Sequence, residues 1–521
     1  MTWRIGVVCL TGLATLATVG FFPVGANAAE ASGSSYGTER PVQALTLQEA
    51  FTLGLSNSRA VQSARFQPLQ AEEDYQKARS IYDPSIFMVS TTERTDRPTQ
   101  SLLDGVPNES ALQEDRWQLQ AGIKNRMPTG GSLALYQEAG RLASNSDYIY
   151  PDPQYQSRIV ASLTQPLLKG IGDKEGATSI EVAGLNQQIA ESAFKRDVTA
   201  VLMEIASNYW QLYFEQNVAR VSRESLARAE EVYRREKTRA EQGLSKPVDV
   251  DRALVAMKSR KSSLLRANNQ FRLTMRQLWL SLAPEQMFAP DDIPELEIKE
   301  LPQLNSFPWP RRELLAGALN QRQELAIARD TVEVSNQQKS LAEHNQLPVL
   351  DLKLTYGFSG LDDTQNGLAS DPYDTQNNNW KVELAFEWPL GGRSASAEKR
   401  KADYRLLQTK TDMRLAAERI SLEVDMVVDE LQLAEEELAA NREAMEAARR
   451  VMAGEEVLFE LGQKDNQDLL TVQDYFGSSE KEYLRALSRY NLNLVSLSRA
   501  KGTLLSDYGL RTELAAVKSY E

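Results

Sequence analysis

Few residues of this chain carry the chemistry that catalysis or metal binding requires. His344 is the only histidine and Cys9 the only cysteine among the 521 residues. A Ser-His-Asp triad or a zinc site of histidine and cysteine is therefore not expected. Gly170-Ile171-Gly172 lacks the third glycine and the βαβ context of a dinucleotide-binding loop. We interpret His344 as a charge near the end of a helix, and predict no enzymatic activity, no cofactor and no metal.

The first 28 residues are typical of a cleaved signal peptide. Arg4 precedes an apolar run that continues through Phe22, and Ala26-Asn27-Ala28 has small residues at both recognition positions of a cleavage site. A retained membrane anchor is the alternative, but threonine and glycine interrupt the run. Because Cys9 lies inside this segment, the exported chain has no cysteine and no disulfide.

The charge balance disfavours nucleic acid as a partner. The net charge is −13, and removal of Arg4 with the signal peptide changes it to −14. A chain this acidic lacks the basic surface that neutralises phosphates.

Residues 29–44, which follow the predicted signal peptide, are predicted to form a polar linker rich in serine and glycine.

Residues 380–392, WKVELAFEWPLGG, join two kinds of periodicity. Val382, Leu384 and Phe386 alternate with charged or small residues, which predicts a strand with one apolar face. Pro389 and the two glycines end this strand. Residues 394–461 contain no proline and have a seven-residue apolar repeat, which predicts a helix on the order of 100 Å long.

The rest of the chain contains further strands and helices of these kinds. Thr46 and Glu49 form a predicted capping box at the start of a first helix that breaks near residues 57–58. The other predicted helices span residues 177–242, 247–282, 312–345, 394–461 and 463–506. The predicted strands span residues 85–92, 117–124, 132–138, 155–165, 350–356 and 380–388. Residues 117–138 form a predicted hairpin, and the proline-rich residues 284–310 a connector.

Internal similarity indicates a two-fold structural repeat. Pro84 corresponds to Pro348 at an offset of 264, and Pro166 to Pro389 at an offset of 223. At an offset of 219, Gly243 and Asp249 correspond to Gly462 and Asp468. We therefore predict a first repeat over residues 45–283, a second over 311–506 and a C-terminal tail over 507–521.

Strands of this kind need partners from other copies of the chain. Their charged faces need water and their edges need hydrogen bonds, so several protomers must share one β-barrel. Phe386, Trp388 and Leu352 would face lipid. The residues expected to face the barrel lumen are Asp351, Lys353, Lys381, Glu383 and Glu387. A half-exposed soluble sheet is the alternative.

The chain resembles the TolC family of outer-membrane efflux proteins over nearly all of its mature length. The motifs that carry this resemblance are SLTQPLLKG and AFEWPLGG at the strand-to-helix junctions, and EQGLSKPVDV and ELGQKDNQDLL at two helical turns. The resemblance implies an α+β membrane protein: a homotrimer whose outer-membrane β-barrel continues into a long periplasmic α-helical, coiled-coil barrel. It also implies an exit duct for efflux or type I secretion, with a periplasmic adaptor (membrane fusion) protein and an inner-membrane transporter as partners, in a Gram-negative-type envelope.

One feature departs from the family. Its members usually have four strands per protomer and close about 12 in the trimer. We predict that the hairpin at residues 117–138 adds two strands per protomer, giving about 18 and a wider barrel. The alternatives are a hairpin that folds into the lumen or lies outside the barrel.

The resemblance also implies roles for residues at the two helical turns. Gly243, Leu244 and Gly462 match adaptor-docking positions. The residues that match the periplasmic gate are Asp249, Lys464, Asp468 and Phe459. A bridge from Lys464 to Asp249 would hold the gate shut, although both aspartates would also serve as helix caps. Thr471 stands at a second acidic position of the family. A periplasmic coiled-coil scaffold without a pore is the rival function.

Overall fold

The computed structural model describes residues 42–101, 104–106, 110–282, 295–299, 302, 310–365 and 377–511. These residues lie in one compact unit that begins at Val42. The predicted signal peptide and most of the predicted linker, connector and tail lie outside the described residues.

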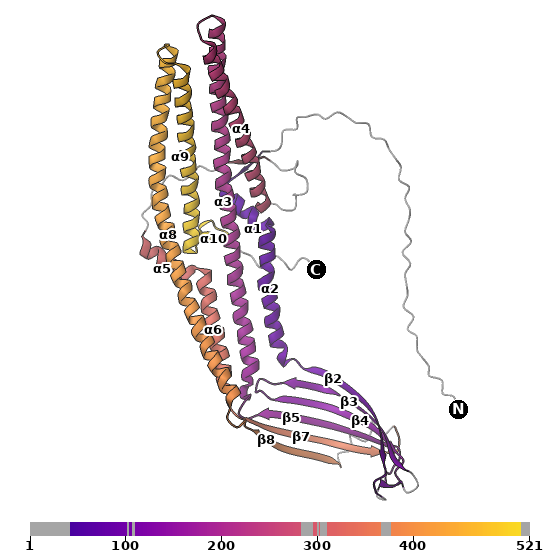
Figure 1. Ribbon diagram of the computed structural model, residues 1–521. Coiled ribbons are helices and arrows are strands. Elements are labelled where there is room, and N and C mark those ends of the chain that lie inside the picture. The colour runs from indigo at the N-terminus through magenta and orange to yellow at the C-terminus, as the bar shows by residue number, and fades with distance from the viewer. Residues whose placement is uncertain are drawn as a thin grey trace, which may run out of the picture. The chain divides into compact units, whose positions relative to one another are not determined.

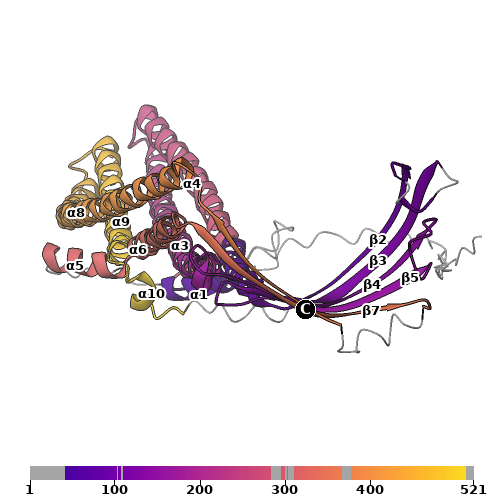
Figure 2. The same cartoon turned by 90° about the horizontal axis from the view of Figure 1, so that it is seen from below.

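The strands form one antiparallel sheet in the order β2-β3-β4-β5-β7-β8 (Figure 1). Their bounds are β2 Ser85–Pro98, β3 Ala111–Arg126, β4 Ser132–Ser144, β5 Gln154–Pro166, β7 Val349–Asp362 and β8 Asn378–Glu387. The sheet is strongly curved (Figure 2). The predicted hairpin lies inside the sheet, where β3 pairs with β2 and β4 pairs with β5. The alternatives in which it leaves the sheet are therefore wrong for this chain.

Several strands are longer than predicted. β2 continues to Pro98 and β4 to Ser144, so residues 93–98 and 141–144 are strand where the sequence predicted loop. Both faces of these strand ends carry polar residues, so the sequence there shows no alternation of polar and apolar residues. They are strand because their backbone groups continue the hydrogen-bonded ladders of their neighbours.

The two faces of the sheet differ in chemistry. Register places Ile86, Ile123, Leu135 and Tyr356 in one row across the sheet. Large apolar side chains on this face are uncovered: Ile86 is 85% exposed, Trp380 74% and Leu384 63%. The opposite face carries most of the charged side chains. Among the described residues, no layer covers this apolar face, and its exposure to water is costly.

Two pairs of long helices continue from the sheet. Helices α3 (Lys174–Glu241) and α8 (Arg393–Glu460) have 68 residues each, and α4 (Pro247–Leu282) and α9 (Asn466–Lys501) have 36 each. At about 1.5 Å per residue, the longer pair measures about 100 Å, as predicted. Helix α3 packs against α4 and α9, and α8 packs against α9. Among the described helices, none is both long enough and apolar enough to span a bilayer.

Shorter helices lie along the long ones. Helices α1 (Leu47–Asn57) and α2 (Arg59–Arg79) meet at Ser58, where a break was predicted, and Thr46 forms the predicted capping box with Glu49. The predicted single helix over residues 312–345 is instead α5 (Arg311–Gln321) and α6 (Gln323–His344). The break falls at Arg322, whose extended backbone places its side chain among charged partners described below.

The largest hydrophobic core surrounds α1 and includes a small parallel sheet that the sequence did not predict. In this sheet β1 (Val42–Leu45) pairs with β6 (Glu295–Ile298). β1 includes the last residues of the predicted linker, and β6 lies within the predicted connector. Leu45 and Phe51 are buried against Ile205, and the Tyr209 hydroxyl donates to the Leu45 carbonyl at 3.1 Å. Four-residue strands whose paired positions are 253 residues apart leave no periodic signal in the sequence.

The turn of the additional hairpin, residues 127–131, is docked on the junction between β5 and α3. Gly172 N donates to the Thr129 carbonyl at 2.9 Å. Arg126 Nη2 lies 2.5 Å from Oδ1 of Asp173, which is buried and also accepts from Gly176 N at the start of α3. The additional strands are thereby joined to the helical part of the chain at their base.

Gly130 and Gly172 form a matched pair for testing this docking. Both have positive φ, +86° and +68°, but a Cβ on Gly130 would lie 1.9 Å from the Gly170 oxygen, whereas one on Gly172 would meet open space. We expect Gly172→Ala to lower the unfolding free energy by about 1 kcal/mol and Gly130→Ala by at least about 2 kcal/mol more. Urea unfolding measured by circular dichroism would test this, and equal losses would contradict the docking.

Because of Glu215 on α3, we expect the stability of the folded chain to depend on pH. Its side chain is buried, and burial raises the pKa of the carboxyl, although the hydrogen bond from Gln211 at 2.8 Å and the charge of Arg485 oppose the shift. The native state therefore favours the protonated form, so stability is lost as pH rises through the folded-state pKa. We expect Glu215→Gln to raise the melting temperature at pH 7, with the gain disappearing near about pH 4. A gain of equal size at both pH values would contradict this account.

Candidate functional site

The two long helical hairpins end in turns of the same geometry. Gly243 and Gly462 have φ values of +75° and +72°, in the left-handed region that favours glycine. Leu244 N donates to the Arg239 carbonyl, and Gln463 N donates to the Leu458 carbonyl, so each helix is closed by the same backbone bond. Leu244 is 68% exposed at its tip.

The structure brings together some of the predicted gate residues. Lys464 Nζ lies 3.5 Å from Asp468 Oδ2 and 3.9 Å from Glu455 Oε1. Asp249 pairs instead with Arg252, at 3.4 Å. Within the described part of this chain, Lys464 and Asp249 do not form an ion pair.

The prediction that Asp249 and Asp468 cap their helices is wrong. Asp465, not Asp468, caps α9, because its Oδ1 accepts from Asp468 N at 2.9 Å. Asp249 is the third residue of α4, and its backbone N donates to the Lys246 carbonyl. Asp249 and Asp468 thus lie in the first turns of their helices, where the helix dipole favours a negative charge.

Phe459 is buried rather than exposed in a passage. It is 4% exposed and packs with Val232, Ala253 and Leu469, and the Arg235 guanidinium lies 5.6 Å from its ring centre. Asn466 Nδ2 also donates to the Asp249 carbonyl at 2.8 Å. The two hairpins are therefore held together next to their tips.

Arg260 of α4 makes a contact with α9 that the sequence did not predict. Although only 7% of it is exposed, its guanidinium donates to the Leu470 carbonyl at 3.0 Å, to Gln473 Oε1 at 2.9 Å and to Asp474 Oδ1 at 2.9 Å. All three acceptors lie on α9. The internal repeat gives no signal here, because the position corresponding to Arg260 is Ser479.

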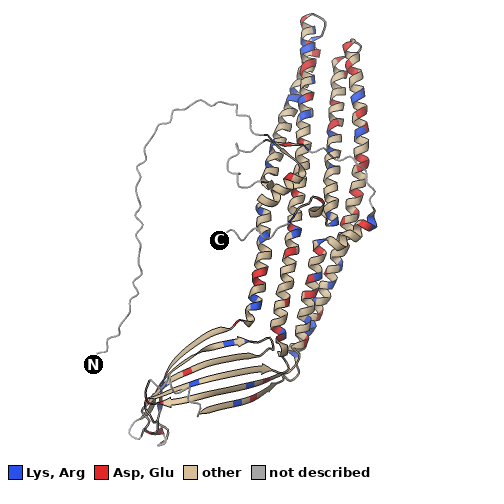
Figure 3. Cartoon of the chain, turned by 180° about the vertical axis from the view of Figure 1, so that it is seen from behind, with Lys and Arg blue, Asp and Glu red and all other residues tan. Residues whose placement is uncertain are grey.

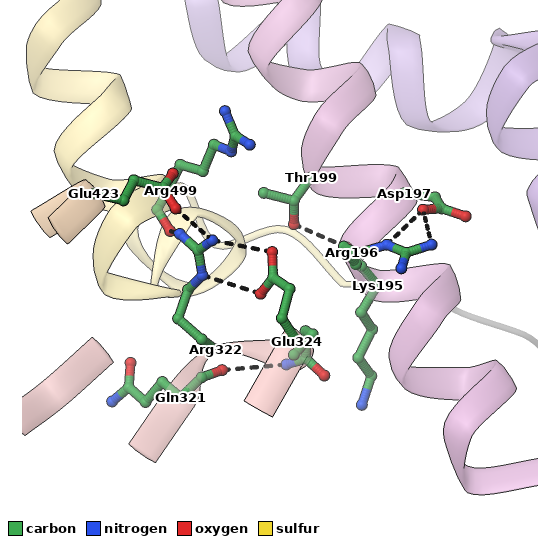
Figure 4. Close-up of polar contacts among 10 residues, drawn as sticks. Lys195, Arg196, Asp197, Thr199, Gln321, Arg322, Glu324, Glu423 and Arg499 are labelled. Atoms are coloured by element: carbon green, nitrogen blue, oxygen red, sulfur yellow. Dashed lines mark hydrogen bonds and ion pairs between the residues drawn. The ribbon is translucent and has the colours of Figure 1, made fainter. Parts of the chain in front are cut away.

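Arg322 joins three helices at the break between α5 and α6 (Figure 4). It donates to both carboxylate oxygens of Glu324 at 3.0 Å, to Glu423 of α8 at 2.7 Å and to the Arg499 carbonyl of α9 at 3.3 Å. Burial lowers the pKa of Arg322, but the two glutamates outweigh it and raise the pKa above its ordinary value. This network lies at the break between α5 and α6 and joins it to α8 and α9.

The five residues predicted to face a lumen lie on one face of the sheet. Register pairs Lys353 with Glu383, and Asp351 and Glu387 lie on the same side. Glu383 contacts Lys353 at 3.3 Å and Lys381 at 2.6 Å. Charged residues are sparse on the sheet and interspersed with both signs along the helices (Figure 3).

His344 lies in the last turn of α6, at the helix end where the sequence placed it. Its Nε2 accepts a hydrogen bond from Gly170 N at 3.0 Å, which joins α6 to the segment that precedes α3. Within the described ranges, no cluster of three or more His, Cys, Asp or Glu side chains forms a candidate metal site.

The fold is that of outer-membrane channel proteins. It is similar to the outer membrane channel CmeC of Campylobacter jejuni, with a TM-score of 0.65 and 13% identity over 88% of this chain and 86% of that one. It is also similar to VceC of Vibrio cholerae, with a TM-score of 0.63 and 15% identity over 88% and 96% of the two chains. The open state of the Neisseria gonorrhoeae channel MtrE has a TM-score of 0.62 and 15% identity over 88% and 89%.

Residues 314–503 match the outer membrane efflux protein family. The resemblance to the TolC-type outer-membrane efflux proteins is confirmed by this match and by the fold. The predicted location in the outer membrane is confirmed with it, and the family is one of channel proteins rather than enzymes. No curated protein matches the chain.

Arg260 provides a test of how the hairpins are joined. We expect Arg260→Gln to raise hydrogen exchange in residues 466–474 by about tenfold, because several charge-assisted bonds to α9 are lost. The control is Arg442→Gln, an exposed arginine that forms an ion pair with Glu446 on its own helix, which should leave this exchange unchanged. Hydrogen exchange mass spectrometry would measure both, and unchanged protection in Arg260→Gln would show that the contact does not hold the hairpins.

Proposed function

We propose that three copies of this chain form the outer-membrane exit duct of a tripartite efflux or type I secretion system. The observation that carries this proposal is a sheet with an uncovered apolar face, continuous with helices of 68 residues. The apolar face would contact lipid and the helices would extend the passage into the periplasm. The family match supports the same function.

Open edges and apolar stripes support a closed ring. β2 and β8 are the two outer strands of the sheet, so each lacks a partner on one side in the described chain. The outer helices, α4 and α8, carry exposed apolar stripes. The stripe residues are Val248, Val255, Leu265, Leu273 and Leu280 on α4, and Tyr404, Leu407, Leu415, Leu422, Met426 and Leu433 on α8. The α4 stripe lies in the half of the helical layer near the tips, whereas most of the α8 stripe lies nearer the sheet. Side-by-side packing of copies in a ring would cover each stripe with a different part of the neighbouring copy.

Closure by three copies would give a barrel of about 18 strands rather than 12. Support comes from β3 and β4, which are paired on both sides and occupy the middle of the sheet. The duplication also remains a proposal. It is supported by the equal lengths of α3 and α8 and of α4 and α9, and by helix breaks at Ser58 and Arg322, which are 264 residues apart.

The two tips would serve as the periplasmic gate and the adaptor-docking site. Gly243, exposed Leu244 and Gly462 would contact the adaptor, which couples the duct to an inner-membrane transporter. Asp249 and Asp468 would line the entrance, with Lys464 balancing Asp468. Phe459 would act by packing the hairpins together. A scaffold without a pore would have no use for an uncovered apolar sheet face.

Ion selectivity in planar bilayers tests the duct and its entrance together. We expect the mature protein to conduct ions and to prefer cations, because rings of Asp249 and Asp468 attract them. Asp249→Asn combined with Asp468→Asn should move the reversal potential in a potassium chloride gradient toward zero. The control is Asp412→Asn combined with Glu418→Gln, which removes two exposed charges of α8 far from the tip. Absence of any conductance would refute the duct, and an unchanged reversal potential would refute the entrance assignment.

A further inference from the structure

The apolar face of the sheet ends in a row of side chains that includes Trp117 of β3, Arg141 of β4, Tyr155 of β5 and Asp362 of β7. On β4 this face carries Leu133, Leu135, Gln137 and Ala139, and the next residue on the same face is Arg141. Gln137 donates to the Ser157 hydroxyl of β5 at 3.4 Å, so its amide has a partner within the sheet. The distance from Leu133 to Arg141 is eight residues, about 26 Å along a strand. Because the strands of a barrel are tilted, this length of strand spans most, but not all, of the apolar band of an outer-membrane protein, which is about 25 Å tall. Arg141 thus lies at the edge of the band that is farther from the helices.

Two aromatic residues flank this arginine. Register places Trp117 of β3 opposite Arg141 on one side and Tyr155 of β5 opposite it on the other. Both rings are half-buried, whereas Arg141 is exposed. Tryptophan and tyrosine prefer the boundary between hydrocarbon and headgroups, so this row marks the membrane surface.

Arg141 differs from the nearby cation on the same face. Arg94 lies one row farther out and pairs with Asp115, at 3.8 Å. Arg141 takes part in no ion pair with the described residues. An exposed guanidinium next to hydrocarbon can donate to both oxygens of a phosphate, and two neighbouring rings would exclude water from that bond.

We infer that Trp117, Arg141 and Tyr155 form a binding site for the phosphate of a glycolipid in the outer leaflet. The inference rests on the proposed function, because it requires the apolar face to contact lipid. The strands run away from the helices toward this row, so the leaflet it faces is the one opposite the periplasm. In an envelope of this type that leaflet presents phosphorylated glycolipid, with acyl chains that would lie along Leu133, Leu135 and Ala139.

Lipid retention tests the site. The mature protein, Arg141→Gln and Arg158→Gln are each reconstituted in phosphatidylcholine vesicles with either diphosphorylated lipid A or phosphatidylglycerol. They are then re-extracted in detergent, and bound lipid per chain is measured by mass spectrometry. Arg158 is a matched control, because it is an exposed arginine on the adjacent strand that lies on the opposite face. We expect Arg141→Gln to retain about fivefold less lipid A, and Arg158→Gln as much as the unaltered protein.

Conductance measured in the same vesicles separates the two proposals. If all three proteins conduct but Arg141→Gln retains lipid A normally, the lipid site is refuted and the duct stands. If phosphatidylglycerol is retained as well as lipid A and with the same dependence on Arg141, the assignment to a glycolipid is wrong. If the unaltered protein neither inserts nor conducts, the duct is refuted and the lipid site with it.

Discussion

The open hydrogen-bonding edges of the curved sheet are the constraint on which the rest of the structure depends. In the proposed duct, an edge strand within the membrane would have no water to satisfy its backbone, so β2 and β8, the outer strands of the described sheet, would require strands from other copies. The uncovered apolar face and the stripes on α4 and α8 impose the same requirement on side chains. Backbone, sheet face and helical layer thus agree on lateral association, and that agreement makes a ring of copies a better interpretation than a single folded chain.

Much of the architecture follows from local sequence patterns. Alternation at Val382, Leu384 and Phe386, prolines at the junctions, and glycines at the tips have direct physical meaning, and the structure places strands, ends of strands and turns there. The hairpin at residues 117–138 was also predictable, because a strand pair with a tight turn needs no distant partner.

Features that depend on contacts between distant residues were not predictable. The pairing of β1 with β6 and the bonds of Arg260 to α9 require partners that only the folded chain brings near. The break at Arg322 is different, because it lies 264 residues after the predicted break at Ser58, at the offset of the internal repeat. The predicted gate residues show both what the sequence could predict and what it could not. Their positions at the helix starts followed from the sequence, but the pairing of Lys464 with Asp468 rather than Asp249 depends on the path of the turn.

The docked hairpin turn has a consequence for flow along the passage. β3 and β4 end at the turn over residues 127–131 and have no helices of their own to continue them. In a ring of three copies, about 18 strands would stand on the same four long helices per copy. A barrel radius grows roughly in proportion to strand number, so the bore would be about 1.5 times that of a 12-stranded ring, with about twice the cross-section. The passage would be wider in the membrane than in the helical section, and the longer helical section would offer the greater resistance to flow.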